Sequence, residues 1–236
     1  MVAQVPAITI ESSLPVLAEE RVLLYNISWE TFERLLAEVG DRRHTHFHFW
    51  HNRLEIMSPL ARHEGSNRFI DDLIRALADE LDLNLRKLGS LTLKRRDRKA
   101  GGEPDSCYYI QNEPAVRQYQ DIDLQRDPPP DLVLEIDITS PSDSRFPIYA
   151  SLGVPELWKY DGHTLQYYTL QQGRYVAVDR SPTFPDLPAA TVVEYLDKRF
   201  EVGEMQALRA FRAWVRQTIG PTLKTESQSP VPPSTS

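Results

Sequence analysis

Apolar and polar positions follow two different patterns along the chain, and these predict interleaved helices and strands. A helical pattern of apolar residues, caps and terminal glycines marks five segments: 28–40, 61–88, 142–153, 189–199 and 204–219. Runs typical of strands mark seven segments: 45–59 (a hairpin), 90–97, 106–110, 131–138, 156–162, 164–171 and 174–179. This interleaving predicts one α/β or α+β domain.

Length and composition fit one folded domain with irregular ends. The chain has 236 residues, of which 41% are hydrophobic, which is enough for one core and short for two. We expect a flexible leader over 1–20 and a single domain over 21–219. Residues 220–236 are rich in Pro, Ser and Thr, and we expect them to form a disordered tail.

The charge balance gives little support to a nucleic-acid partner. The formal net charge is -7, whereas proteins that bind nucleic acid usually carry a basic face. A local basic run could still form such a face, through Lys94, Arg95, Arg96 and Arg98. A solvated hairpin is the alternative, and charge patterning does not separate the two interpretations.

Cysteine usage and hydropathy favour a cytoplasmic protein. Cys107 is the single cysteine, so it has no partner for an internal disulfide or a cysteine zinc site. The N-terminus lacks the features of a signal peptide. No segment is long and apolar enough to cross a membrane, so we expect no membrane partner.

The segment 131–138 combines an apolar strand with three carboxylates. Alternate side chains share a strand face, so Leu132, Leu134, Ile136 and Ile138 form an apolar face. The opposite face carries Asp131, Val133, Glu135 and Asp137, and carboxylates there repel one another if they are buried. Water, basic side chains or a divalent cation could each resolve this repulsion.

Several histidines lie close together in and before the predicted hairpin: His44, His46, His48 and His51. Alternation would place His46 and His48 on one face of a strand. A metal site is one interpretation. A solvent-facing strand side is the simpler one and the one we expect, because no second pair of ligands is evident.

A Pro-Asp dipeptide, at Asp105, begins the strand over 106–110, and alone it is only turn-like. Together with "PDLVLEIDITSPSDSRFPIY", "GVPELWKYDG" and "LEIMSPLARHE", the segment "EPDSCYYI" resembles the Uma2 family of restriction endonucleases. The resemblance covers roughly residues 26–196. It implies a restriction-endonuclease-like fold of the PD-(D/E)xK superfamily, with a mixed central sheet flanked by helices.

The resemblance also implies a metal site. Asp105 matches the first metal-binding carboxylate and Glu135 the second, and the carbonyl of Ile136 would be a further ligand. Asp131, which precedes the strand of Glu135, is a weaker candidate for a metal ligand. Mg²⁺, or alternatively Mn²⁺, would activate a water molecule and stabilise charge on a scissile phosphate.

Three other residues have weaker family support. His63, near the start of the long helix, lies in a recurrent family position and is a candidate catalytic residue, with a local hydrogen-bonding role as the alternative. Glu64 and Glu55 could each add a carboxylate to the site, and we expect a structural role for both.

The chain departs from the family pattern at the expected lysine. The position two residues after Glu135 is Asp137, and Arg145 stands where many relatives have a lysine on the following helix. Arginine stays protonated, so Arg145 cannot act as a general base, although it can stabilise charge and pair with Glu135. Lys94 and Lys159 are spare amines on predicted strands, and solvated lysines are the simpler interpretation.

The leading hypothesis is a Mg²⁺-dependent endonuclease acting on DNA. Asp105 and Glu135 would bind the metal, and the basic run would follow the DNA backbone. A homodimer would suit the cutting of two strands. The alternatives are a catalytically impaired member that binds nucleic acid or assembles with proteins, and a purely structural domain.

Overall fold

The computed structural model describes residues 20–40, 45–58, 61–89, 91–138 and 143–219, and it describes no side chain at 20 and 61–63. Residues 1–19 of the predicted leader and the whole predicted tail lie outside these ranges. A lipid bilayer could not be crossed by any helix within them, because none combines sufficient length with sufficient apolar character.

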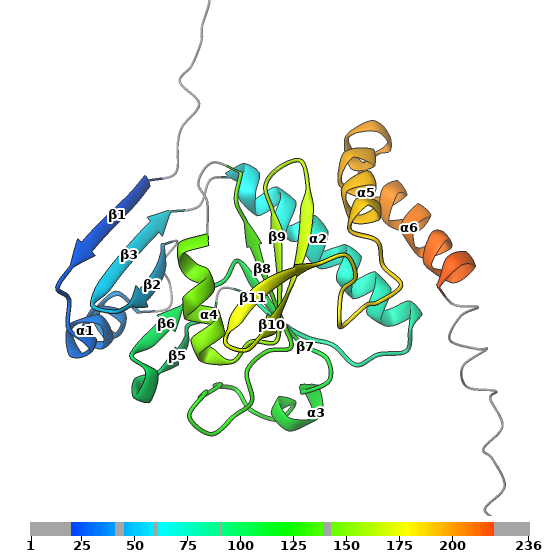
Figure 1. Ribbon diagram of the computed structural model, residues 1–236. Helices are drawn as coiled ribbons and strands as arrows, with labels where there is room; N and C mark the ends of the chain where they lie inside the picture. The colour runs from blue at the N-terminus through cyan, green and yellow to red at the C-terminus, as the bar shows by residue number, and fades with distance from the viewer. Residues whose placement is uncertain (1–19, 41–44, 59–60, 90, 139–142, 220–236) are drawn as a thin grey trace, which may run out of the picture.

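The first sheet contains five antiparallel strands in the order β1-β3-β2-β6-β5 (Figure 1). Its strands are β1 (Glu20–Tyr25), β2 (His46–Trp50), β3 (Arg53–Ser58), β5 (Leu93–Arg95) and β6 (Ala100–Gly102). Helix α1 (Trp29–Val39) covers one face, where the rings of Phe32 and Phe49 stack 4.9 Å apart. As predicted, the Ser28 hydroxyl caps this helix.

The second sheet contains six strands in the order β11-β10-β9-β8-β7-β4. Its strands are β4 (Arg86–Leu88), β7 (Ser106–Tyr109), β8 (Leu132–Ile136), β9 (Glu156–Tyr160), β10 (Leu165–Gln171) and β11 (Arg174–Val178). Strands β8 and β9 run parallel, and the other neighbours pair antiparallel, so the sheet is mixed. The predicted α+β class with a mixed central sheet is therefore confirmed.

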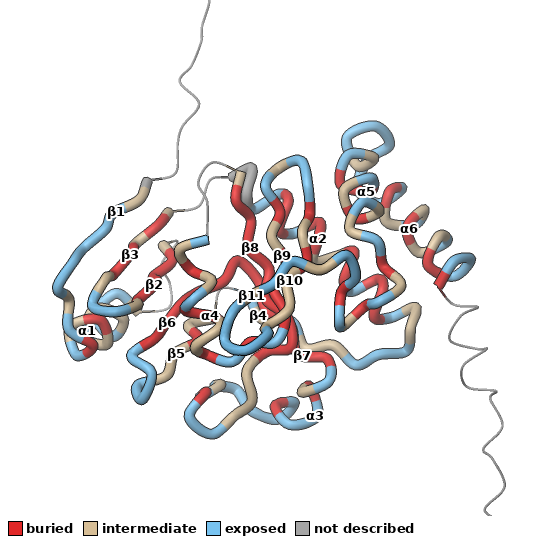
Figure 2. The backbone as a smooth tube through the Cα atoms, in the orientation of Figure 1, coloured by how far each residue is buried: buried red, intermediate tan, exposed pale blue. Residues whose placement is uncertain are grey.

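Strand β8 lies at the centre of this sheet and is buried on both faces (Figure 2). Leu132, Leu134 and Ile136 pack in a core that includes three helices: α2 (Ala61–Glu80), α5 (Ala189–Val202) and α6 (Glu204–Thr218). Val133, on the other face, packs with helix α4 (Phe146–Leu152). Short helical turns complete the fold: η1 (Arg96–Arg98), α3 (Glu113–Val116) and η2 (Asp143–Arg145).

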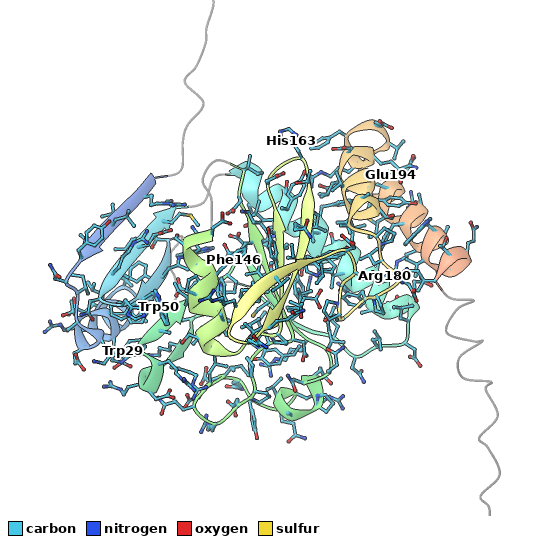
Figure 3. All side chains as sticks on the ribbon, viewed as in Figure 1. Trp29, Trp50, Phe146, His163, Arg180 and Glu194 are labelled. Carbon is cyan, nitrogen blue, oxygen red and sulfur yellow. The ribbon has the colours of Figure 1, made fainter. Side chains whose placement is uncertain are left out.

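Helix α4 lies between the two sheets (Figure 1). It contacts β2, β5 and β6 on one side and β11 on the other. Its Phe146, labelled in Figure 3, packs edge-to-face on Tyr168 and Tyr175 of the second sheet. Because η2 directly precedes α4, residues at this junction reach strands of both sheets.

The long helix predicted over 61–88 is too long. Helix α2 ends at Glu80, because Asp82 adopts a left-handed conformation with φ of 53°. Leu85 and Leu88 continue the helical spacing of apolar residues, but they lie beyond the helix and pack against two different cores. Strand β4 takes up this stretch, and no strand was predicted there.

Two other strands were not predicted from the sequence. Strand β1 follows the leader and pairs with β3 along its whole length. Strand β6 falls in "KAGGEPD", which the glycines mark as a loop. These glycines allow close packing instead, because a Cβ at Gly101 would lie 2.8 Å from the ring of Phe32.

Candidate active site

Asp105 and Glu135 lie next to each other on neighbouring strands. Ser106 of β7 is opposite Leu134 of β8 in an antiparallel pair. Asp105, which precedes Ser106, is therefore next to Glu135, which follows Leu134. Asp105 is fixed there, because its Oδ2 accepts a hydrogen bond from the backbone N–H of Ile136 at 2.7 Å. The two carboxylates predicted from the sequence are thus brought together.

Glu135 is completely buried, and both of its carboxylate oxygens accept hydrogen bonds. Arg145 Nη1 donates to Oε2 at 2.6 Å, and the hydroxyl of Tyr149 donates to Oε1. Burial raises the pKa of Glu135 to about 8, against the opposing effect of the Arg145 charge, and the Asp105 charge raises it further. Arg145 is therefore the positive partner that the acidic strand requires.

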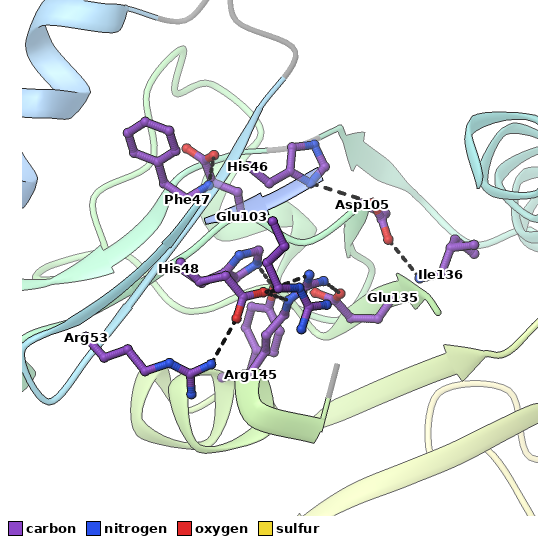
Figure 4. A network of polar contacts seen from close by, with 12 residues as sticks. His46, Phe47, His48, Arg53, Glu103, Asp105, Glu135, Ile136 and Arg145 are labelled. Carbon is purple, nitrogen blue, oxygen red and sulfur yellow. Dashed lines mark hydrogen bonds and ion pairs between the residues drawn. The ribbon is translucent and has the colours of Figure 1, made fainter. Parts of the chain in front are cut away.

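Arg145 bridges strands of the two sheets. Its guanidinium contacts Glu135 of β8 and also donates from Nε and Nη2 to Oε1 of Glu55 on β3, at 3.3 and 3.2 Å. Only 2% of Arg145 is exposed. Burial alone would lower its pKa, but the carboxylates of Glu135 and Glu55 raise it overall, so the guanidinium stays charged. Glu55, expected to be structural, is part of this network. Figure 4 shows Arg145 beside Glu135 in it.

The two histidines of β2 face the carboxylates, and the prediction of a solvent-facing strand side is wrong. His46 and His48 are 9% and 2% exposed, because this face of the first sheet packs against α4 and Asp105. His46 Nδ1 lies 3.7 Å from Oδ1 of Asp105. His48 Nε2 lies 3.4 Å from the Tyr149 hydroxyl, and burial together with the Arg145 charge holds its pKa well below the usual value.

A pocket of about 280 Å³ opens beside Asp105. Its walls include His46, Glu64, Asn67, Arg68 and Ser106. Asn67, on α2, positions the start of β7, because its Nδ2 donates to the Asp105 carbonyl at 3.1 Å and its Oδ1 accepts from the Ser106 hydroxyl at 2.9 Å. The Asp105 carboxylate therefore lines an open space, whereas Glu135 lies behind it in the interior.

Comparison with known families assigns this chain to a family. Residues 29–196, well over half of the chain, match the family Uma2, described as putative restriction endonuclease. The chain belongs to the Uma2 family. The resemblance inferred from the sequence motifs is thus confirmed.

A solved structure is also similar to this Uma2 chain. It is the crystal structure of a putative nuclease belonging to DUF820 from Anabaena variabilis ATCC 29413, with a TM-score of 0.51 and 16% sequence identity. The alignment covers 72% of this chain and 99% of that chain. At this identity the similarity concerns the fold alone. No curated protein matches the chain.

The other carboxylates on the acidic face of β8 have local partners. Asp131 Oδ2 accepts from the backbone N–H of Ile110 at 2.6 Å and of Asn112 at 2.9 Å, so it holds the turn after β7. Asp137 lies 3.4 Å from Lys159 Nζ, and both residues are largely buried. Basic side chains and backbone donors therefore cover this face, and the interpretation that it is open to water is wrong.

Lys159 occupies a notable position in this Uma2 chain, although it was expected to be a solvated lysine. It is the Cα partner of Glu135 across the parallel pair of β8 and β9. Its ammonium also donates to Asp143 at 2.5 Å. Lys94, the other spare amine, lies 3.4 Å from Glu33 of α1.

Each side chain of the predicted basic run has an acidic neighbour. The pairs are Lys94–Glu33, Arg95–Asp97, Arg96–Glu33, Arg96–Glu30 and Arg98–Asp97. The run lies on β5 and η1, near α1, at the lower left of Figure 1, whereas the end of β8 and the start of α2 lie at the top of that view. Local acids thus reduce the positive field of this hairpin.

Two catalytic candidates near α2 have different outcomes. The side chain of His63 lies outside the part of the chain whose side chains are described, so its predicted role stays a prediction. Glu64 lies at the pocket and forms an exposed ion pair with Arg68 at 2.5 Å.

The contact of Tyr149 with Glu135 was not predicted from the sequence. Tyr149 follows Arg145 by four residues, the spacing that places two side chains on one helix face, so this signal was available.

The donor atoms fit a hard divalent cation. Asp105, Glu135 and the Ile136 carbonyl offer oxygen ligands, the type that Mg²⁺ prefers. Each Glu135 oxygen accepts one hydrogen bond and retains a second lone pair. Within the described side chains, however, no three His, Cys, Asp or Glu residues stand together as a ready metal site. Binding would therefore require small side-chain movements around Asp105.

Proposed function

We propose that this chain is a metal-dependent endonuclease that hydrolyses phosphodiester bonds in DNA. One observation carries the proposal: Asp105 and Glu135 lie side by side on β7 and β8, beside a pocket that the Asp105 carboxylate lines. Membership of a family described as restriction endonucleases supports the reaction class. The function does not follow from the fold alone.

The residues divide into those that would hold a cation and those that position them. Asp105, Glu135 and the carbonyl of Ile136 would hold Mg²⁺ or Mn²⁺, which lowers the pKa of bound water and neutralises charge on a phosphate. Arg145 keeps its proton, so its role is to orient Glu135 and to offset negative charge. Tyr149 fixes the second oxygen of Glu135.

The direct test is cleavage of plasmid and single-stranded DNA with Mg²⁺ or Mn²⁺. We expect Glu135→Gln and Asp105→Asn to abolish cleavage while retaining the fold, because each keeps the shape of the side chain and removes the carboxyl group that would bind the cation. Glu201→Gln, an exposed change on α5, is the matched control and should cleave like wild type. Equal cleavage by wild type and Glu135→Gln would reject the proposed site.

A second candidate function is DNA binding or protein assembly without cleavage. It is favoured by the ion pair between Glu135 and Arg145, because a fixed cation already neutralises the carboxylate that a metal would need. This candidate predicts that wild type binds DNA but does not cleave it. It also predicts that Mg²⁺ and Mn²⁺ leave the melting temperature unchanged, since only a ligand that binds the folded state raises it.

DNA binding through the hairpin of β5 and η1 is a separate proposal. The four basic side chains would release their acidic neighbours and bind phosphates instead; they are Lys94, Arg95, Arg96 and Arg98. Replacing all four by Gln should reduce the slope of log affinity against log salt by roughly 0.9 for each phosphate that the variant no longer neutralises. An unchanged slope would place the DNA elsewhere.

The proposed homodimer is a further point. Light scattering of the free and DNA-bound protein tests it by measuring the molar mass.

A further inference from the structure

His46 connects the first sheet to the carboxylates of the second. It lies at the start of β2, and its Nδ1 faces Oδ1 of Asp105 at 3.7 Å. The other Asp105 oxygen is occupied by the backbone N–H of Ile136. Figure 4 shows the imidazole beside the Asp105 carboxylate, on the side away from Arg145.

We propose that His46 and Asp105 together bind the divalent cation of this site, and that the imidazole makes the site prefer Mn²⁺ over Mg²⁺. This inference rests on the metal dependence in the proposed function and specifies the metal. An octahedral ion with each donor atom about 2.1 Å away holds neighbouring ligands about 3.0 Å apart. The two donor atoms are 3.7 Å apart, so they would have to approach each other by about 0.7 Å. Small movements of the two side chains are enough to form a shared site.

The chemistry of the two donors determines the preference. Mg²⁺ demands oxygen ligands and keeps several of its waters, whereas first-row transition ions accept imidazole nitrogen readily. A site with carboxylate ligands alone gives little discrimination between Mg²⁺ and Mn²⁺. Adding one imidazole strengthens binding of Mn²⁺ and leaves that of Mg²⁺ almost unchanged.

Access distinguishes His46 from the second histidine of β2. His46 and Asp105 both line the pocket of about 280 Å³, so an ion can reach them from solvent. His48, two residues along the same face, is almost completely buried and contacts Tyr149 of α4. The pocket and the His46–Asp105 distance are independent observations that indicate the same position.

The test is direct metal binding, measured by calorimetry on full-length protein without a histidine tag. We expect wild type to bind Mn²⁺ at least about tenfold more tightly than Mg²⁺, a difference of about 1.4 kcal/mol. His46→Gln should lose about tenfold in Mn²⁺ affinity and less than about threefold in Mg²⁺ affinity. His163→Gln, an exposed histidine near α5 (Figure 3), is the matched control and should behave like wild type.

Pulsed electron paramagnetic resonance of Mn²⁺ bound to wild type gives a second readout that needs no variant. Coordination by His46 should produce a coupling to a directly bound nitrogen, and its absence would overturn the inference. Unchanged Mn²⁺ affinity in His46→Gln, with binding abolished in Asp105→Asn, would overturn it and leave the nuclease proposal intact. A nitrogen signal without DNA cleavage would support it and reject the nuclease. Failure of wild type to bind either metal would overturn both.

Discussion

Replacing Arg145 by Met should destabilise the protein severely, because it removes the one group that joins Glu135 to Glu55. Methionine fills a similar volume and adapts to irregular cores, so the main loss is the charge and its hydrogen bonds. Glu135 would keep the Tyr149 hydroxyl as a donor. It would otherwise be a fully buried carboxylate without the cation that now compensates it.

The expected cost follows from burial and geometry. Arg145 is 2% exposed and donates one 2.6 Å hydrogen bond to Glu135 and two of 3.2–3.3 Å to Glu55. Removing one partner from a buried pair of this kind costs about 3–5 kcal/mol. Proton uptake limits the cost, since the pKa of Glu135 is already raised to about 8 and would rise further without the guanidinium.

The cost should therefore depend on pH. The unfolded chain releases the Glu135 proton near its ordinary pKa of 4.5, whereas the folded chain retains it to about pH 8. The free energy of unfolding contributed by this group falls as pH rises through that window. In Arg145→Met the fall should continue above about pH 8, so the difference from wild type is larger at about pH 9 than at about pH 6.

Urea denaturation followed by tryptophan fluorescence measures these differences, since the chain has four tryptophans. The double variant Arg145→Met with Glu135→Gln should regain part of the loss, because a neutral amide needs no cation. Arg216→Met, which breaks an exposed ion pair with Glu80, is the control and should change little. A loss for Arg145→Met as small as that of this control would refute the reasoning.

Three further predictions concern residues outside the metal site. Asp131→Ala should cost about 2 kcal/mol, because the buried N–H of Ile110 loses its acceptor, and calorimetry should find unchanged metal affinity. Glu156→Ala should cost a similar amount and alter tryptophan fluorescence, because the indole N–H of Trp158 loses a buried acceptor 2.6 Å away; an unchanged spectrum would contradict this. Burial raises the pKa of Cys107 from 9.0 to about 12, so a thiol reagent at neutral pH should label only the unfolded chain. The free energy of unfolding should accordingly fall between about pH 9 and about pH 12, and labelling of the native chain would contradict the burial.

The sequence predicts the local elements of this fold well where pattern and caps agree. The central strand, helix α1 with its Ser28 cap, and the C-terminal helices are all found in their predicted segments. The pairing of Asp105 with Glu135 was also predicted, because the family motif fixes the order of the two strands. Arg145 was predicted as a partner of Glu135, and the structure shows this ion pair.

The error over the histidines arises from the packing of distant segments. The face of His46 and His48 looks polar in sequence, yet it is covered by α4, about 100 residues further along the chain. Glu33 of α1 lies against Lys94 and Arg96 of the basic run, a contact that the local sequence does not reveal. Sequence periodicity reports how one segment folds, and it carries no information about which distant segment covers it.

The position of α4 between the sheets has a consequence for how the protein responds to damage far from the pocket. Arg145 and Tyr149, at the start of α4 and within it, contact carboxylates of both sheets: Glu55 of the first and Glu135 of the second. Neither sheet alone therefore holds all of these groups in place. Any substitution that weakens the packing of one sheet against the other should separate these groups before the chain as a whole unfolds. The proposed nuclease activity would then be lost on mild heating before the secondary structure is lost.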